Sequence, residues 1–524
     1  MNTIEFLQIS AAVVADREAL VEVGGNGKRI LYMEMYPLVV KLANGLQGLG
    51  VERGQKVAVM SVNSADYVIS YYACAMLGAT FVPLNYRAKD EELTHMLNVS
   101  QCSALFVSDR YLPLVERIRP TLSHTQHFIA YHGGPDSYLD YDRLLEDSSE
   151  EEMYVEIDDN DPTILIFTSG TTALPKGVVL TYLDMTAYVT NTMSPADPEV
   201  HDKTLVSAPF FHIAGATAMM SSIWGGRTLV ILPVFTPEAW LEAAERERAT
   251  HSFVVPTMLK RIMEEPAFES CDISSMRLIT YGAAPMPYEV VRRACDIFPP
   301  KGVGLMNAYG QTESTSTLTF LAPEDHDLSA DVDVREARLR SVGRPMPDVE
   351  IGIMDDRNRV LTAGEEGEIC VRSDRVMKGY YKQEDATSSA IIDGWLHTGD
   401  LGRVDDGGYL FITGRKKDLI IRGGENISAG EIENCLEGHP KIEEAAVIGV
   451  PDPDWGEVVK AVVVLKQGER VTAPEVIEYC KARISSFKAP QYVAVVNELP
   501  RNALGKILKN DLRKTHGSPA NENA

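Results

Sequence analysis

Apolar and polar positions follow two alternating periods along the first hundred residues of the chain. Short apolar runs are typical of buried strands, whereas apolar residues three and four positions apart indicate helices that cover a sheet. Asn63 or Ser64 can cap the first such helix, and Gly78 can end it. The order β-α-β-α-β predicts a parallel sheet. The expected strands are 56–62, 80–83 and 104–107, with helices between the first two strands and near 90–98.

A second set of strands and helices has the same order further along the chain. Apolar strands again alternate with helical segments, which predicts a second sheet of the same kind. Both sheets then belong to one large N-terminal region. The expected strands are 204–208, 228–232 and 252–255, and the expected helices are 214–224 and 237–249.

The last third of the chain changes its pattern twice. From about 340 to 412, short strands are broken by Gly and Asp, which favours a small antiparallel or barrel-like section. The basic segment 414–428 is expected to form a hairpin at a junction. Residues 429–512 mix helices with strands and predict a compact α+β unit. The polar tail from Thr515 is expected to be frayed.

Length and charge narrow the classes of function. A chain of 524 residues exceeds what one core usually fills, so two or more domains are expected. Lys and Arg number 50 against 75 Asp and Glu, which gives a net charge of −25. Such an acidic surface argues against a nucleic-acid partner or an anionic-membrane partner. An anionic substrate then needs a local positive pocket.

Cysteine usage and hydropathy indicate the compartment. The 7 cysteines include no C-x-x-C pair, which is typical of reduced core thiols and of neither a disulfide frame nor a zinc site. The start of the chain carries Glu5 where a signal peptide has Lys or Arg. No apolar run approaches the roughly 18 residues of a membrane span. A cytoplasmic location is therefore expected.

The loop 168–177 follows the apolar strand 163–167 and combines four hydroxyls, two glycines and Lys176. Backbone N–H groups and hydroxyls can ring an anion, and glycine permits close approach of the backbone. With the lysine charge added, the loop suits a polyphosphate. It is not a Walker A loop, because no Gly-Lys-Ser/Thr follows a four-residue spacer. On local grounds alone, a plain turn is the alternative.

A second polar segment, Asn307–Glu313, follows an apolar run and is expected to form one loop. Tyr309 can stack on a purine and Thr312 can bond a phosphate. The Glu313 carboxylate can hold a magnesium ion, since that ion prefers oxygen ligands. A polar turn without a ligand is the alternative.

Four further side chains are candidates for the same site. Asp400 is expected at a glycine turn, where it can take both hydroxyls of a ribose, and Arg415 can reach that sugar or a phosphate. Lys506 follows a glycine on a loop and can bridge a carboxylate and an α-phosphate. A turn former, an exposed arginine and a surface lysine are the alternatives. His212 has no evident carboxylate or Cys partner nearby, which favours an aromatic wall or a packed histidine over acid–base work.

The order and spacing of these motifs resemble the core motifs of the ANL superfamily of acyl- and aryl-CoA synthetases, adenylation domains and luciferases. The resemblance runs from about residue 10 to 512. It implies an N-terminal AMP-binding and acyl-binding domain, residues 1–413, and a small mobile C-terminal domain, residues 414–524, with a hinge at Lys417. The segments that carry the resemblance are Thr168–Gly177, Pro209–Gly215, Asn307–Glu313, Trp395–Asp400, Gly414–Ser428 and Pro500–Lys506.

The resemblance also implies roles for individual residues. The implied catalytic residues are Lys506, needed for adenylation, Glu313 and Thr168 for magnesium, and His212 as a gate between acyl pocket and thiol tunnel. Gly423, Gly424 and Glu425 fall on the CoA side. Ala173 replaces the usual glycine of the phosphate loop. The residues implied in ATP and AMP binding are Thr168, Ser169, Gly170, Thr171, Thr172, Lys176, Asn307, Ala308, Tyr309, Gly310, Thr312, Asp400, Arg415 and Lys506.

Candidates for the acyl pocket come from the same motifs. Small residues leave room there, and methionines make adaptable apolar walls. The set contains no acidic residue to pair an amino group, which favours a hydrophobic acid, medium-chain, alicyclic or aryl, over an amino acid. The alternative is that these positions only pack the core. The candidates are His212, Ala216, Met219, Met220, Tyr281, Gly282, Ala283, Ala284, Met306, Asn307 and Ala308.

The implied activity is that of an AMP-forming acid–thiol ligase that uses ATP, Mg²⁺ and CoA. One alternative is an acyl-AMP ligase that loads a separate carrier protein, although Pro451–Glu457 looks like the CoA synthetase version of that region. Another is a non-catalytic sensor on the same fold, which need not retain Lys506. A homodimer is compatible with the resemblance.

Overall fold

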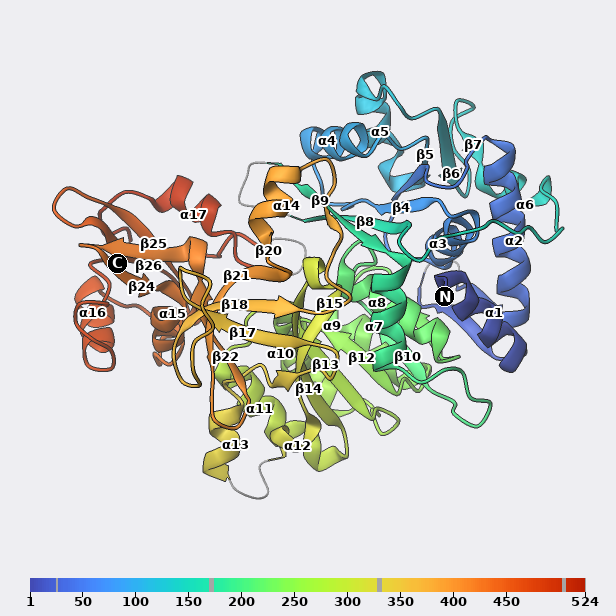
Figure 1. The fold of residues 1–524 in the computed structure, drawn as a ribbon. Coiled ribbons are helices and arrows are strands. Elements are labelled where there is room, and N and C mark those ends of the chain that lie inside the picture. Colours follow the sequence, from blue (N-terminus) through green and yellow to red (C-terminus); the bar gives the residue numbers. More distant parts are fainter. Residues whose placement is uncertain (25–26, 169–173, 328–331, 502–505, 524) are drawn as a thin grey trace.

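A computed structural model describes residues 1–524 except 25–26, 169–173, 328–331, 502–505 and 524. In this described part, the strands form four sheets (Figure 1). No helix of this part combines the length and the hydropathy needed to cross a membrane.

The first sheet contains the parallel strands predicted from the start of the chain. Its central strands run parallel, and a hairpin and a short strand extend it antiparallel at one edge. The order across the sheet is β19 (Gly379–Tyr380), β9 (Lys176–Thr181), β8 (Pro162–Thr168), β4 (Thr80–Pro83), β3 (Lys56–Met60), β5 (Ala104–Ser108), β6 (His127–Tyr131) and β7 (Leu139–Asp140).

Helix α3 (Ala65–Leu77) begins and ends where the sequence predicts. The Ser64 hydroxyl accepts a hydrogen bond from the backbone N–H of Tyr67 at 3.1 Å, which caps the first turn. Gly78 then ends the helix in the left-handed conformation, with φ of 66°. Every residue of α3 is buried, because the helix lies between the two large sheets.

The second sheet confirms the second predicted alternation. Five neighbouring strands, β11, β10, β12, β13 and β14, run parallel. Their carboxyl ends therefore lie at one edge, where loops can form a site. The order is β16 (Arg344–Pro345), β15 (Ser316–Leu321), β14 (Gly304–Gln311), β13 (Leu278–Gly282), β12 (His251–Val254), β10 (Lys203–Val206), β11 (Thr228–Ile231), β1 (Glu18–Glu22) and β2 (Arg29–Leu31).

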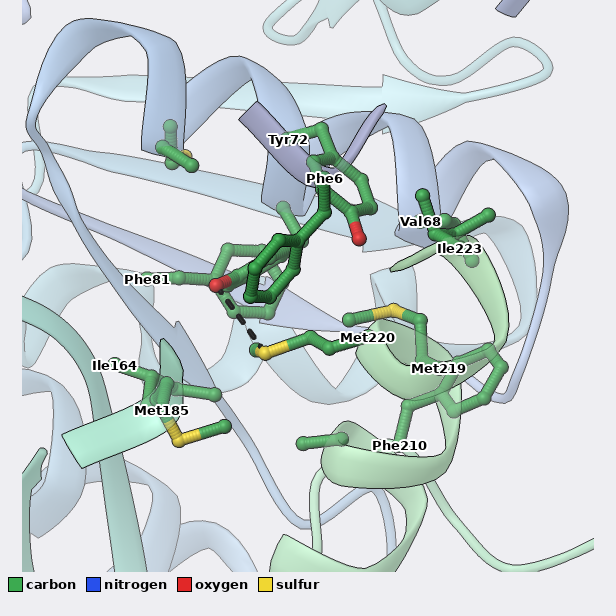
Figure 2. Packing of buried hydrophobic residues seen from close by; sticks show 14 of the residues in the cluster. Phe6, Val68, Tyr72, Phe81, Ile164, Met185, Phe210, Met219, Met220 and Ile223 are labelled. Atoms are coloured by element: carbon green, nitrogen blue, oxygen red, sulfur yellow. Dashed lines mark hydrogen bonds between the residues drawn. The ribbon is translucent and has the colours of Figure 1, made fainter. Parts of the chain in front are cut away.

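Apolar helices join the two large sheets into one core. Figure 2 shows part of this core, where Phe6, Val68, Phe210 and Ile223 come together from distant parts of the chain. The helices of the large domain are α1 (Thr3–Val13), α2 (Tyr32–Gly48), α3, α4 (Asp90–Ser100), α5 (Leu112–Ile118), α6 (Tyr141–Glu146), α7 (Tyr182–Thr192), α8 (Ile213–Trp224), α9 (Pro237–Arg246), α10 (Pro256–Glu264), α11 (Tyr288–Ile297), α12 (Pro323–His326), α13 (Val332–Arg338) and α14 (Glu384–Ala390).

The third sheet is antiparallel throughout, as its short Gly-broken strands predict. It lies between the large sheets and the small domain (Figure 1). Its strands are β17 (Glu350–Met354), β18 (Gly367–Arg372), β21 (Trp395–Val404), β20 (Ile391–Ile392) and, also paired to β21, β22 (Leu410–Arg415).

The fourth sheet and its helices form the small C-terminal domain, drawn in orange-red to red in Figure 1. The predicted basic hairpin is present as the antiparallel pair β23 and β24. The strands are β24 (Glu425–Ser428), β23 (Leu419–Arg422), β26 (Gly456–Leu465), β25 (Ile442–Asp452) and β27 (Tyr492–Val496), with helices α15 (Ala429–Glu437), α16 (Ala473–Lys481) and α17 (Lys509–His516).

The prediction of a frayed tail is wrong. The backbone of Glu522 bonds both to Val493 and to Val495, which adds the tail to β27. The Glu522 carboxylate also accepts a hydrogen bond from Lys460, whose side chain is fully buried. A buried ammonium requires acceptors, and the polar tail supplies them, with Ser518 O at 2.9 Å from Lys460 Nζ.

Candidate active site

Asp400 lies at the centre of a hydrogen-bonded group that joins three strands. It is buried on β21, and Arg415, its register partner on β22, places Nε 2.8 Å from Oδ1. The Tyr309 hydroxyl, from β14, donates to Oδ2 at 2.8 Å. Burial and the nearby Asp400 charge raise the pKa of Tyr309 well above its usual value, so the phenol stays a donor. The group can accept from paired hydroxyls such as those of a ribose.

Two expectations about local structure are corrected here. Asn307–Gln311 belongs to strand β14, and only Thr312–Ser314 forms a turn, so the segment is not one loop. Asp400 belongs to strand β21 and not to a turn. Pairing with β15 and β22 explains both cases, because tertiary partners extend a strand through residues with weak strand propensity.

A second polar group lies around Tyr380 on β19. The Tyr380 hydroxyl donates to Glu313 Oε1 at 3.0 Å, and Lys176 Nζ lies 5.1 Å from the centre of the same ring. Lys176 is the register partner of Thr168 across the β8–β9 hairpin. Thus one phenol ring brings the cation of the predicted phosphate loop near the predicted magnesium ligand. Five predicted positions of the phosphate loop lie outside the described residues: Ser169, Gly170, Thr171, Thr172 and Ala173, the last of which replaces the usual glycine.

The side chains of Glu313 and Thr168, near Tyr380 and Lys176, fit a magnesium ion. Glu313 and Thr168 are half-buried and offer a carboxylate and a hydroxyl, both oxygen donors. Mg²⁺ is held in proteins by one or two such oxygens together with substrate phosphates. The nearby Lys176 charge suits those phosphates as well.

Arg375, which the sequence reasoning missed, holds the turn that carries Thr312 and Glu313. Its side chain is 1% exposed, and its Nε lies 2.6 Å from Asp348. Its Nη1 donates to the carbonyl oxygens of Ser314 (3.2 Å) and Thr315 (3.4 Å). Thr315 and Ser316 have φ of 49° and 77°, values that residues other than glycine rarely adopt. Arg375 therefore stabilises a strained turn through hydrogen bonds to its backbone.

Replacing Arg375 with alanine should lower the free energy of unfolding by about 3 kcal/mol, because Asp348 and two carbonyls lose their buried donor. Urea unfolding measures this loss. Arg372→Ala is the matched control, since Arg372 is half exposed and pairs with Glu350 at 3.4 Å. Its cost should stay below about 1 kcal/mol. Equal losses in the two variants would contradict a stabilising role of Arg375 at this turn.

The segment after β13 lies directly against β14. A Cβ on Gly282 would lie 2.1 Å from the carbonyl oxygen of Ala308, so glycine is required at this position. Ala283 has φ of 66°, an unusual value for alanine. Ala283, Ala284 and Ala308 are half-buried, which leaves part of each side chain accessible. Small side chains therefore line this edge, as expected for a pocket wall.

Other acyl-pocket candidates pack the core in this structure. Met219 and Met220 of α8 are 1% and 0% exposed, and Figure 2 shows both within the core. Met220 Sδ accepts from the Tyr71 hydroxyl at 3.5 Å, and the Tyr281 hydroxyl lies 2.8 Å from His326 Nε2. Ala216 is also buried. This packing matches the core-packing alternative for these positions, and their contact with an acid stays a prediction.

Lys506, from the small domain, lies close enough to Asp400 and Arg415 for their charges to act on it, and the region around these three residues is called the cleft below. Burial, together with the charges of Arg415 and Lys417, lowers the pKa of Lys506 to about 7, while Asp400 opposes the shift. Burial and the Lys506 charge lower the pKa of His212 to about 4, so this imidazole is neutral at pH 7. His212 caps α8, its Nδ1 facing the Ala214 N–H at 3.5 Å. The structure thus brings together Lys506, His212, Arg415 and Asp400.

The expected CoA-side residues lie elsewhere. Gly423 and Gly424 form the exposed turn between β23 and β24, and Glu425, also exposed, begins β24. A Cβ on Gly424 would meet no atom within 4 Å. Lys417, the expected hinge, is also exposed. In this orientation, therefore, the small domain presents Lys506 to the cleft, and the Gly423–Gly424 turn lies outside it.

One group of side chains in the described part has the spacing of metal ligands: Glu368, Cys370 and His397. Lys416 Nζ already lies 3.1 Å from Glu368, and His397 Nδ1 lies 3.0 Å from the same oxygen. Burial and Glu368 raise the pKa of the Cys370 thiol to about 12. A protonated thiol and an ammonium at the carboxylate favour a structural ion-pair group over a metal centre.

Two family models match this chain. Residues 7–381 match the family described as AMP-binding enzyme, and residues 431–506 match the AMP-binding enzyme C-terminal domain. An indoleacetate–CoA ligase of Aromatoleum aromaticum is 35% identical, over 95% of this chain and 96% of its own. A feruloyl-CoA synthase of an Amycolatopsis species is 36% identical, over 94% and 95%. The solved o-succinylbenzoate CoA synthetase of Bacillus subtilis, in complex with its acyl-adenylate intermediate, aligns with a TM-score of 0.82 and 30% identity, over 98% of both chains.

The fold and the matched family models define an AMP-binding enzyme with a large N-terminal and a small C-terminal domain. The chain belongs to the AMP-binding enzyme family, and its resemblance to the ANL superfamily is confirmed. The solved relative confirms the fold class as well, a large α/β N-terminal domain followed by a small C-terminal domain.

Proposed function

We propose that this protein is an ATP-dependent acid–CoA ligase. It joins a hydrophobic carboxylic acid to AMP, releases pyrophosphate, and then transfers the acyl group to the thiol of CoA. The observation that carries the proposal is that the small domain places the Lys506 charge near the Asp400–Arg415 pair. The relatives named as CoA ligases support it.

In the first step a carboxylate oxygen attacks the α-phosphorus of ATP, and the bond from this phosphorus to the β-phosphate oxygen breaks. Asp400 and Arg415 hold the ribose, and Lys176 holds the outer phosphates. The Lys506 ammonium lies between two anions that repel each other and stabilises the charge on the α-phosphoryl oxygens. Mg²⁺, held by Glu313 and Thr168, would neutralise phosphate charge as pyrophosphate leaves.

In the second step the thiol of CoA attacks the acyl carbon, and the bond to the AMP oxygen breaks. After the first step, the Lys506 side chain occupies the path of the thiol. We expect the small domain to turn about Lys417, which withdraws Lys506 and brings Gly423, Gly424 and Glu425 to the cleft. Neutral His212 would separate the acyl pocket from the thiol path without taking up a proton.

The acid is proposed to be hydrophobic, and the side chains of the predicted pocket support this. Gly282, Ala283 and Ala284 leave a pocket wall of small side chains, with Met306 half-buried beside them. The predicted pocket set contains no carboxylate that could pair an amino group. Relatives named for indoleacetate and ferulate make an aryl acid the first choice, with medium-chain and alicyclic acids as the other arms of the test.

A pyrophosphate-release screen tests the function. Aryl, medium-chain, alicyclic and amino acids are supplied with ATP and Mg²⁺, with and without CoA. Sustained release that needs both the acid and CoA, with AMP and acyl-CoA as products, is expected. Release that CoA does not accelerate would favour a separate carrier protein as acceptor. No release with any acid would favour a non-catalytic sensor.

The low pKa of Lys506 predicts a pH dependence. Its ammonium form is present below about pH 7 in the free enzyme and is lost as the pH rises through that value. The two anionic substrates stabilise the ammonium form, so bound substrates raise this pKa. We expect kcat/KM for ATP to fall above about pH 7 while kcat persists to higher pH. Parallel profiles for the two quantities between pH 6 and 9 would contradict this assignment.

A further inference from the structure

An ion pair links the large domain to the small domain outside the cleft. Lys260, on α10, contacts the Glu443 carboxylate at the start of β25 through its Nζ. Both side chains are about one-third exposed, at 29% and 35%, so solvent reaches the pair. The contact exists only in domain orientations that keep α10 beside β25, and the present one also places Lys506 in the cleft.

The backbone of β25 presents Glu443 to the large domain. The pairing of β25 with β26 shifts register between Ile442 and Glu444, and Glu443 is the extra residue. Such a bulge re-aims a side chain that a regular ladder would direct elsewhere. Glu443 therefore points outward from the small domain, toward Lys260.

Two neighbouring acidic side chains already have cations of their own within the small domain. Lys509 Nζ lies 2.7 Å from Glu433, and Arg501 Nη2 lies 2.7 Å from Glu444. Glu443 is matched instead across the domain boundary, by Lys260.

Glu437, on α15, shows that the Lys260 charge also reaches the acidic group behind Glu443. Burial, then Glu433 and Glu444, raise the pKa of Glu437 to about 7, and Arg501 and Lys260 oppose this shift. Docking of α10 thus adds a positive charge to a surface with excess negative charge.

We propose that Lys260 and Glu443 form an electrostatic latch that stabilises the adenylate-forming orientation of the small domain. The inference rests on the proposed function for its catalytic consequence, but the contact itself can be tested without it. Both are positioning residues, since neither touches the nucleotide cleft. The latch is specific to one orientation, so breaking it should slow the first half-reaction and leave the second unaffected or faster.

Charge reversal tests the catalytic consequence. Lys260→Glu or Glu443→Lys should lower acid-dependent pyrophosphate release about 3- to 10-fold, while thioester formation from supplied acyl-AMP is kept. The double reversal, Lys260→Glu with Glu443→Lys, should restore release to within about twofold. Lys441→Glu is the matched control, because Lys441 pairs with Glu475 at 2.8 Å within the small domain. The variants should converge with wild type at about 1 M salt, where charges are screened.

Zero-length carbodiimide cross-linking tests the contact. The reagent joins a lysine amine and a carboxylate into an amide only while they touch, and mass spectrometry of the digest identifies the linked peptides. We expect a Lys260–Glu443 link alongside the control link Lys441–Glu475, and linked enzyme that still forms acyl-AMP but no thioester. A control link without the Lys260–Glu443 link overturns the latch, as does equal slowing of both half-reactions by charge reversal. A Lys260–Glu443 link in a protein that releases pyrophosphate with no acid supports the contact and refutes the proposed function.

Discussion

Replacing Lys506 with alanine should lower acid-dependent pyrophosphate release by about 100- to 1,000-fold, the usual cost of removing one donor that stabilises transition-state charge. The reason is geometric as well as electrostatic. Lys506 is the cation that the small domain brings to Asp400 and Arg415, where the carboxylate and the α-phosphate have to approach each other. Without it, their mutual repulsion is opposed only by groups placed for the ribose and the outer phosphates.

The same Lys506→Ala variant should form thioester from supplied acyl-AMP and CoA at close to the wild-type rate. This second half-reaction is the internal control, because it shows that the variant is folded and binds AMP. Lys509→Ala is an outside control, since Lys509 lies on α17 and pairs with Glu433 away from the cleft. Loss of both half-reactions, at normal stability, would refute the role assigned to Lys506.

Replacing Gly424 with leucine should have the reverse effect. Gly424 is exposed in the present orientation, with φ of 89° and no atom within 4 Å of where a Cβ would lie. The first half-reaction should therefore be nearly unchanged. If the β23–β24 turn moves to the cleft for the second step, a leucine there would displace the thiol and slow thioester formation about 100-fold.

A variant at an equivalent exposed turn separates backbone strain from this effect. Gly468→Leu places the same side chain at a φ of 83°, also with open space, in another turn of the small domain. It should leave both half-reactions intact. Quenched-flow measurement of each half-reaction distinguishes backbone strain from a role of Gly424 on the CoA side. Unchanged thioester formation in Gly424→Leu, or an equal loss in Gly468→Leu, would count against a CoA side at Gly424.

The parts of the fold that could be predicted are those in which local pattern and tertiary packing agree. Helix α3 and strands β3, β4 and β5 have apolar runs bounded by strong signals such as Ser64 and Gly78. The errors occur where a distant partner decides the local structure. Asp400 continues a strand because β22 lies beside it, and the tail packs because Lys460 is buried beneath it.

The site shows the same division. Asp400, Arg415 and Tyr309 are close together, as their motifs imply, and the structure adds which atom donates to which. Arg375 and Tyr380 could not be found from sequence, since neither belongs to a motif and each acts through a segment more than fifty residues away. The methionines of α8 show the converse, because a motif position cannot tell a pocket wall from a core wall.

Transfer of an oxygen label tests the central claim most directly. The acid is supplied with ¹⁸O in its carboxylate, together with ATP, Mg²⁺ and CoA, and the products are weighed by mass spectrometry. If the carboxylate attacks the α-phosphorus and the thiol later breaks the acyl–oxygen bond, one ¹⁸O appears in AMP for each acyl-CoA formed, and pyrophosphate carries none. Label in inorganic phosphate with ADP as the other product, or unlabelled AMP, would contradict the proposed acyl-adenylate.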